Sequence, residues 1–291
     1  MEFNINIIGF GYVGTSIAHL CNENGLKYSV YDKVSLDIIK ERGQSEGYVF
    51  DYFQDLRDLV NNNTKEHTNV YFICVPTPST LNGDCDVSII NNLINNLSKM
   101  IKKKSIIIIK STVKPTTCNE LTKNYPELDL VFCPEFLREL TYKDDIYNSQ
   151  FIMFGANDLK LKSILNDLFL NFLYKHKTED KPKIIYRKFE EAELFKYTVN
   201  TFLATKITFF NEIYELCEKL DIDYQEFKTL FPLEPRIGCY GVKVPGDDGK
   251  YGFGLSCLPK ELASMIQLRG QLGLDKSILE EIKKKNDMLR K

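Results

Sequence analysis

The first thirty-two residues constrain the fold of this chain more than any other stretch. An apolar run over Phe3–Ile8 leads directly into Gly-Phe-Gly-Tyr-Val-Gly, and a helical pattern then continues through Cys21. A second apolar run, Tyr28–Tyr31, ends at Asp32. Strand, three glycines, helix, strand and acid form the order that a dinucleotide-binding βαβ unit requires. We therefore expect a dinucleotide site in this part of the chain.

Each residue type in this motif has a separate task. Gly9 permits the tight turn after the strand, Gly11 lets the backbone approach a pyrophosphate, and Gly14 lets helix and strand pack closely. Asp32 would accept hydrogen bonds from the adenosine ribose hydroxyls and would repel a 2′-phosphate. The motif therefore predicts NAD rather than NADP as the cofactor.

Further apolar runs predict more strands of the same sheet. They lie at Val70–Val75, Ser105–Lys110, Leu128–Cys133, Ile152–Gly155 and Lys183–Tyr186, with helical stretches near 88–101, 117–124 and 159–173. Alternation of strands and helices at this spacing predicts an α/β fold with a Rossmann-like, doubly wound parallel sheet. Ligands of such sheets bind at the carboxyl ends of the strands.

The sequence changes character at Lys188, after which no glycine or proline occurs until Pro232. The pattern over 188–220 predicts one long helix that is apolar around most of its circumference and that presents Phe195, Phe202, Phe209 and Phe210. Such a helix must be buried against another domain or a partner subunit. We therefore expect a Rossmann-like domain over 1–187, an all-α domain with this central helix over 188–291, and a homodimer across the helix.

One cysteine lies in a glycine- and aromatic-rich loop just before a helix. Cys257 follows Gly-Lys-Tyr-Gly-Phe-Gly-Leu-Ser, and Pro259 is well placed to be the first helical residue. This spacing predicts that Cys257 lies just outside a helix N-terminus, where the helix dipole favours a thiolate, and Lys260 adds a nearby cation. A buried, inert cysteine is the alternative interpretation.

Composition excludes several classes of function. The net charge is −2 and no basic stripe is present, so nucleic acid is not an expected partner. No apolar run reaches the ~20 residues of a membrane span, and no signal peptide precedes the first strand. The eight cysteines are scattered without the spacing of a metal site, and none of the three histidines accompanies a nucleophile. We expect a cytoplasmic protein with reduced thiols and no metal.

Eight sequence blocks together resemble the UDP-glucose/GDP-mannose dehydrogenase family. They are, in family order, IIGFGYVG, FICVPTP, IKSTVKPTT, CPEFLRE, AELFKYTVNTFLATKITFFNEI, EPRIG, VPGDDGKYGFG and SCLPKE. The resemblance implies an enzyme that uses two NAD⁺ in succession to oxidise the C6 alcohol of a UDP-sugar to a uronic acid, as in the conversion of UDP-glucose to UDP-glucuronate. It also implies a dimer built on the long helix.

The same resemblance assigns roles to individual residues. It implies a catalytic set in which Cys257 is the nucleophile and in which Lys196 and Asn200 hold the sugar oxygen, together with Thr112, Glu135 and Glu261. The implied cofactor-binding residues are Gly9, Gly11, Tyr12, Val13, Gly14, Asp32, Thr77, Thr112, Glu139 and Lys260. The implied substrate-binding residues are Phe136, Leu137, Arg138, Glu139, Lys196, Asn200, Gly254 and Arg236, the last reaching the neighbouring subunit's site.

Three departures from the family pattern keep alternatives open. Leu255 replaces a glycine of the family, Glu261 replaces an aspartate, and the sequence ends at Lys291, where typical members continue into a UDP-binding domain. Without that domain we expect the nucleotide part of the substrate to be bound more weakly. The alternatives are a partner-dependent or non-catalytic homologue that binds NAD and a nucleotide sugar, and a two-electron NAD-dependent hydroxy-acid dehydrogenase.

Overall fold

The computed structural model describes residues 2–41, 47–64, 66–101, 105–177 and 179–291. The chain forms two compact units, which we describe separately. Unit 1 comprises Met1–Thr77 and Val87–Lys196, and unit 2 comprises Pro78–Asp86 and Tyr197–Lys291. The chain therefore passes from unit 1 to unit 2 within the long helix, and it also visits unit 2 briefly through the segment Pro78–Asp86.

Unit 1 is built on an eight-stranded sheet with the order β3-β2-β1-β4-β5-β6-β7-β8. The strands are β1 (Phe3–Ile8), β2 (Tyr28–Tyr31), β3 (Asp51–Phe53), β4 (Thr68–Ile73), β5 (Ser105–Ile109), β6 (Asp129–Phe132), β7 (Phe151–Gly155) and β8 (Lys183–Arg187). All neighbouring pairs are parallel except β6 and β7, which are antiparallel. The prediction of a doubly wound, parallel α/β sheet is confirmed, and the β6–β7 pair is its one antiparallel pairing among the described strands.

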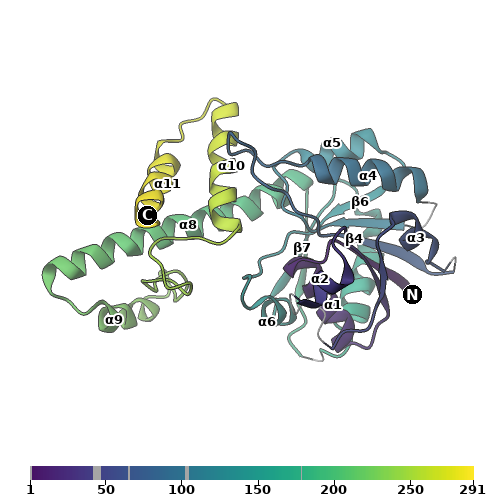
Figure 1. The fold of residues 1–291 in the computed structure, drawn as a ribbon, viewed down its shortest axis with the longest axis horizontal. Coiled ribbons are helices and arrows are strands. Elements are labelled where there is room, and N and C mark those ends of the chain that lie inside the picture. The colour runs from purple at the N-terminus through teal and green to yellow at the C-terminus, as the bar shows by residue number, and fades with distance from the viewer. Residues whose placement is uncertain (1, 42–46, 65, 102–104, 178) are drawn as a thin grey trace. The chain divides into compact units, whose positions relative to one another are not determined.

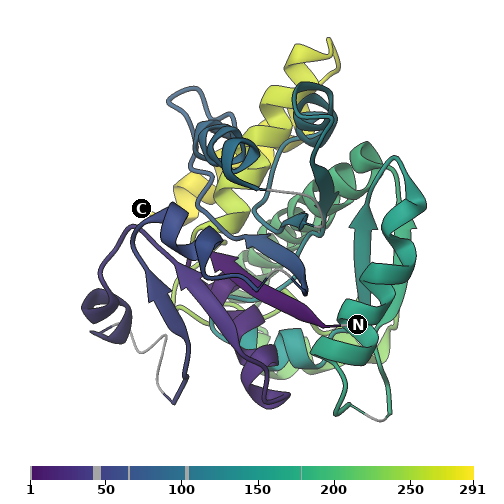
Figure 2. The ribbon, with the colours of Figure 1, turned by 90° about the vertical axis from the view of Figure 1, so that its right-hand side faces the viewer.

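Helices cover both faces of this sheet (Figures 1 and 2). They are α1 (Tyr12–Glu23), α2 (Leu36–Glu41), α3 (Leu56–Asn61), α4 (Ser88–Met100), α5 (Thr117–Asn124), α6 (Tyr142–Tyr147) and α7 (Lys162–Asn166), the last flanked by helical turns at Leu159–Leu161 and Asp167–Leu173. Side chains alternate along β5, so that Ile106 and Ile108 join the core beneath α1 while Ile107 and Ile109 join the core beneath α4. Burial on both faces explains why the central strands are apolar throughout.

The strand order reverses between β1 and β4. The chain from β1 continues to β2 and β3 on one side, whereas β4 lies on the other side and leads on to β5. A crevice for ligands is expected at the carboxyl ends of the strands at such a point. The glycine motif follows β1 directly, and Thr77 and Thr112 follow β4 and β5.

Unit 2 is helical. It holds α8 (Phe189–Leu220) from Tyr197 onward, α9 (Tyr224–Phe227), a helical turn at Lys228–Leu233, α10 (Cys257–Gln271) and α11 (Ser277–Leu289). Ala204 of α8 packs with Phe253 and with Leu262 and Ile266 of α10. A second core forms around Phe210, which is buried against Phe231. The prediction that Phe210 is presented outward is therefore wrong, because the polypeptide between α8 and α10 folds back over it.

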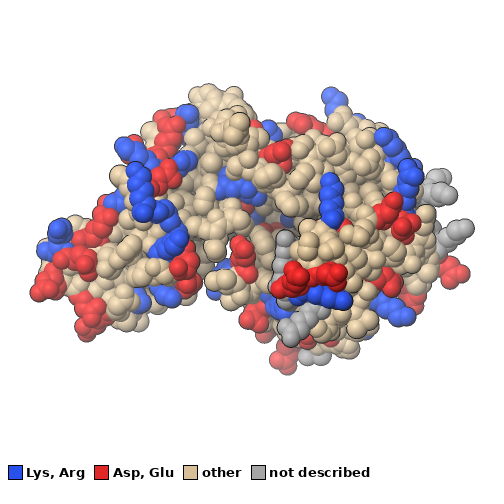
Figure 3. Space-filling view, viewed as in Figure 1, with Lys and Arg blue, Asp and Glu red and all other residues tan. Residues whose placement is uncertain are grey.

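The surface carries charges of both signs. In the face shown in Figure 3, Lys and Arg side chains are interspersed with Asp and Glu side chains over both units. Among the residues that the structure describes, no helix has both the length and the apolar character needed to cross a membrane.

Candidate active site

The loop after β1 is shaped to receive a dinucleotide. A Cβ atom on Gly9 would stand 2.6 Å from the carbonyl oxygen of Cys74, and one on Gly14 would stand 2.0 Å from the carbonyl oxygen of Gly9, so neither position admits a side chain. A Cβ atom on Gly11, in contrast, would meet nothing within 4 Å. Gly11 is the N-cap of α1, and within the described chain no side chain caps that helix and no acid occupies its first turn. The N-terminus of α1 is thus suited to a pyrophosphate.

Asp32 is fixed beside this loop. Its Oδ2 atom accepts a 2.6 Å hydrogen bond from the amide of Phe10, and its Oδ1 atom accepts a 3.1 Å bond from the amide of Val34. These bonds hold the carboxylate at the carboxyl end of β2, where a ribose hydroxyl is recognised in this fold. The local geometry fits NAD.

The ends of β4, β5 and β6 are held together by buried polar groups. Thr77 and Thr112 are both buried, and the Ser111 hydroxyl donates a 2.7 Å hydrogen bond to the carbonyl oxygen of Val75. Lys110 is also buried and donates through Nζ to the carbonyl oxygen of Cys133 at 3.2 Å. Lys110 is not among the predicted site residues, although a lysine at the end of an apolar strand could have indicated a buried polar contact.

A buried ion pair connects the segment after β6 to α8. The Lys196 ammonium lies 3.1 Å from Oε1 of Glu135, and only 3% of each side chain is exposed. Lys196 also donates to the backbone carbonyl oxygen of Glu135 at 2.6 Å, and Oε2 of Glu135 accepts a 2.7 Å bond from the amide of Leu137. Removing two charges from water is costly, so a buried pair of this kind is weak evidence for stability. The pair does, however, place a carboxylate base and an ammonium cation side by side, shielded from water.

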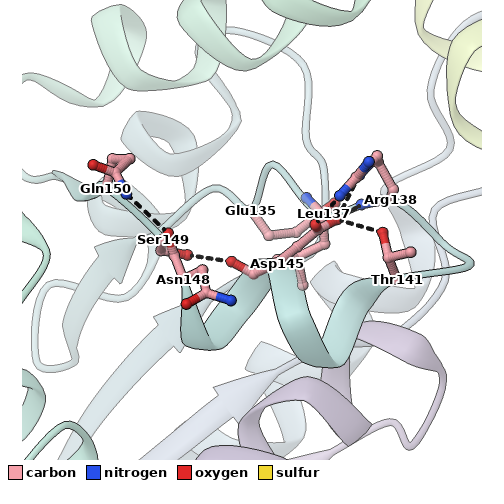
Figure 4. Close-up of polar contacts among 8 residues, drawn as sticks. All are labelled: Glu135, Leu137, Arg138, Thr141, Asp145, Asn148, Ser149 and Gln150. Atoms are coloured by element: carbon pink, nitrogen blue, oxygen red, sulfur yellow. Dashed lines mark hydrogen bonds and ion pairs between the residues drawn. The ribbon is translucent and has the colours of Figure 1, made fainter. Parts of the chain in front are cut away.

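The residues after Glu135 form a separate network, which Figure 4 shows. Arg138 donates to Asp145 through its amide at 2.8 Å and through its guanidinium Nε at 3.0 Å. Burial alone would raise the pKa of Asp145, but hydrogen bonds from Arg138 and Thr141 hold that pKa below its ordinary value. Glu139 is exposed, and the ring of Phe136 packs against Phe195 at 5.6 Å between centroids.

In unit 2, a second buried contact joins two predicted site residues. The Asn200 amide donates a 2.8 Å hydrogen bond to Oε2 of Glu261, and both side chains are buried. Glu261 is the fifth residue of α10 and lies just after its first turn. Lys260 is partly exposed beside it.

Cys257 is the first residue of α10 and is partly exposed, with its sulfur 3.6 Å from the Ser256 hydroxyl. The prediction that Cys257 lies outside the helix is wrong, because proline is tolerated throughout a first helical turn and Pro259 occupies the third position. Leu255, which replaces the family's glycine, has φ = +59°. This is a left-handed conformation in which a leucine is strained.

Two further predicted residues lie elsewhere in unit 2. Arg236 is exposed, and its guanidinium donates two hydrogen bonds to Glu234, of 2.7 and 2.9 Å. Gly254 is packed against Arg290, since a Cβ atom there would stand 2.5 Å from the guanidinium. Within unit 1 the structure thus groups Glu135 with Lys196, and within unit 2 it groups Asn200 with Glu261.

Comparison with known proteins identifies the family of this chain. The model of the UDP-glucose/GDP-mannose dehydrogenase family's NAD-binding domain matches residues 3–173, and the model of its central domain matches residues 190–288. The UDP-glucose 6-dehydrogenase of Rickettsia bellii is 30% identical over 298 residues, an alignment that covers 97% of this chain and 66% of the relative. The chain therefore spans just under two thirds of that relative's length.

Solved structures give the same result. The UDP-glucose dehydrogenase of Pyrobaculum islandicum superposes with a TM-score of 0.78 at 27% identity, over 99% of this chain and 68% of that one. The 3-hydroxyisobutyrate dehydrogenase of Mycobacterium tuberculosis, at 16% identity and a TM-score of 0.69 over 98% of this chain and 92% of its own, shares the fold alone. With its NAD-binding and central domains both matched, the chain belongs to the UDP-glucose/GDP-mannose dehydrogenase family.

Proposed function

We propose that this protein catalyses the NAD-dependent, four-electron oxidation of a UDP-sugar C6 alcohol to the uronic acid, with UDP-glucose as substrate and UDP-glucuronate as product. The observation that carries the proposal is the buried contact of Lys196 with Glu135 in a chain that also presents Cys257 at the start of a helix. The UDP-glucose 6-dehydrogenase named among the relatives supports this choice of substrate.

The first oxidation converts the alcohol to an aldehyde, with loss of a hydride and a proton. When bound, NAD⁺ supplies the hydride acceptor for both oxidations. Lys196 and Asn200 donate hydrogen bonds to the sugar oxygen and stabilise its developing negative charge. We assign Thr112 and Glu139 to binding of the cofactor, and Glu139 also to binding of the substrate. Gly11 lies where the backbone approaches the pyrophosphate of the cofactor.

The second oxidation requires a nucleophile. An aldehyde carbon donates a hydride to NAD⁺ only after a nucleophile has added to it and made it tetrahedral. The Cys257 thiolate adds to the aldehyde carbon, and the resulting thiohemiacetal oxygen takes up a proton. Loss of a second hydride and a proton leaves a thioester on Cys257. Water that Glu135 activates then cleaves the carbon–sulfur bond, which yields the carboxylate and restores the thiol.

A homodimer across α8 is part of the proposal. Phe202 and Phe209 lie seven residues apart in this helix, and they remain 62% and 55% exposed. Leu216 continues the same stripe and is also exposed. A contiguous apolar stripe on a helix is expected to be covered by a partner. In such a dimer we assign Arg236 to the neighbouring subunit's substrate, and we place the enzyme in the cytoplasm.

The test is a stoichiometric one. The protein is incubated with NAD⁺ and UDP-glucose, NADH is followed by absorbance, and the sugar product is identified by mass. We expect two NADH for each uronic acid and no acid from Cys257→Ser, because a serine hydroxyl is a far weaker nucleophile than a thiolate. Cys239→Ser, which changes an exposed cysteine, is the matched control. Acid production by Cys257→Ser at the normal rate would overturn the mechanism.

The same assay separates the alternative functions. One NADH for each product, with a hydroxy acid as the accepted substrate, would identify a two-electron dehydrogenase of the kind whose fold this chain shares. Binding of NAD⁺ without turnover would identify a non-catalytic or partner-dependent homologue. The strained Leu255 favours the latter as the second candidate, since it stands two residues before the proposed nucleophile.

A further inference from the structure

An asparagine of α11, Asn286, holds the loop that leads to Cys257. Asn286 is 5% exposed, and its Oδ1 atom accepts a 2.7 Å hydrogen bond from the amide of Phe253. Its Nδ2 atom donates a 3.0 Å bond to the carbonyl oxygen of the same residue. One side chain therefore satisfies both backbone polar groups of a buried loop residue, much as a neighbouring strand would.

Arg290, at the end of α11, holds the adjoining residues. Its Nε atom donates a 3.0 Å hydrogen bond to the carbonyl oxygen of Phe253, and Nη2 donates to the carbonyl oxygen of Gly252 at 3.3 Å. Its Nη1 atom lies 2.6 Å from the carboxylate of Asp248. The guanidinium thereby contacts three residues of the loop.

The loop also bonds to α8 and fits closely against α11. The amide of Gly252 donates a 3.0 Å hydrogen bond to Oδ1 of Asn211. A Cβ atom on Gly252 would stand 2.4 Å from Oδ1 of Asn286, and the residue has φ = +67°. A glycine is therefore required here by the approach of α11, without any ligand.

This arrangement lies immediately before the strained and reactive part of the chain. Phe253 precedes Leu255 by two residues and Cys257 by four, and Cys257 is already in α10. A leucine in the left-handed region is strained and persists only where surrounding contacts determine its conformation. The bonds to Phe253 on one side and α10 on the other supply those contacts.

We propose that Asn286 and Arg290 are positioning residues, which hold Phe253 so that the Cys257 thiolate is directed at the substrate carbonyl. The inference rests on the proposed function of Cys257. Displacement of the thiolate would slow its addition to the aldehyde more than it would weaken binding of the cofactor or the sugar. The aldehyde would then leave the enzyme before the second oxidation.

The experiment compares Asn286→Ala and Arg290→Ala with the unmodified protein. In the presence of hydroxylamine, which traps aldehydes, we expect NADH formed per uronic acid to rise above two and the trapped aldehyde to appear. We expect kcat for acid to fall on the order of 10- to 100-fold, as for a reacting group misplaced by about 1 Å, while KM changes much less. Lys284→Ala, an exposed change on the same helix, is the control.

Amide hydrogen exchange provides a readout that is independent of turnover. Both variants are expected to lose protection in the segment 251–257, while β1 and β4 keep theirs. A merely structural role would reduce the active fraction and leave the ratio of NADH to acid at two. Acid formation at the normal ratio and kcat by both variants would overturn the inference. Failure of the unmodified protein to form acid would instead refute the proposed function.

Discussion

Glu193 should make unit 1 less stable as the pH rises from 4.5 to about 7. This residue of α8 is fully buried, and its two carboxyl oxygens accept hydrogen bonds of 2.7 and 2.8 Å from the amides of Thr116 and Cys118. Burial raises the pKa of Glu193 from 4.5 to about 7, although the hydrogen bonds from Cys118 and Thr116 oppose this shift. The folded protein therefore binds a proton that the unfolded chain has already released.

The sign of the effect follows from this difference in proton binding. Below a pH of 4.5 the carboxyl group is protonated in both states, and its contribution to stability is fully present. As the pH rises toward 7 the unfolded chain ionises first, so the free energy of unfolding falls. A shift from 4.5 to about 7 corresponds to a loss of about 3 kcal/mol.

Urea unfolding of the unmodified protein and of Glu193→Gln at about pH 5 and about pH 8 measures this loss. The stability of the unmodified protein relative to the variant should decrease by about 2.5 kcal/mol between the two conditions, because glutamine does not titrate and part of the total loss is already present at about pH 5. Glu191→Gln, an exposed change in the same helix, should show no such dependence. If the difference in unfolding free energy between the unmodified protein and Glu193→Gln is the same at both pH values, the reasoning is refuted. The amides at the start of α5 then keep Glu193 ionised in the folded protein.

Three other predictions follow from single features. Asp32→Asn should reduce the ratio of kcat/KM for NAD⁺ over NADP⁺ by about tenfold or more, since a like charge beside the 2′-phosphate costs several kcal/mol; an unchanged ratio would mean that Asp32 does not face the ribose. Leu255→Gly should raise the urea unfolding free energy by up to about 1 kcal/mol, because relief of the positive φ exceeds the added chain entropy of glycine; a less stable variant would contradict this. Phe209→Asp should shift sedimentation from dimer to monomer, whereas Glu218→Gln should not.

Most of the sheet was predictable because its strands are apolar on both faces. The bounds of β1 and β2 agree with the sequence prediction to the residue. The strand β3 was missed because its three residues, Asp51–Phe53, carry no period that could be recognised. The sequence also could not predict that β7 is antiparallel to β6. The residue pattern within one strand carries no information about the direction of the strand beside it.

The candidate site was only partly predictable. Sequence spacing placed Lys196 and Asn200 on one side of a helix, but it could not show that their partners are Glu135 and Glu261, sixty-one residues away in each case. Such pairings depend on tertiary packing. The contacts of Asn286 with Phe253 were missed for the same reason, because an asparagine near the end of a polar helix carries no signal of its own.

The segment Pro78–Asp86 has a consequence for the order in which the protein assembles. It packs within unit 2, where Gly83 lies against Ala263, Asp84 bonds to Gln271, and Cys85 lies beside the buried Tyr197. During synthesis this segment leaves the ribosome more than a hundred residues before the rest of unit 2 exists. Contacts of such sequence separation require the closure of a long loop, whose entropic cost slows their formation. The sheet of unit 1 can therefore become compact first. The segment Pro78–Asp86 reaches its final packing only after the helices of unit 2 have been synthesised.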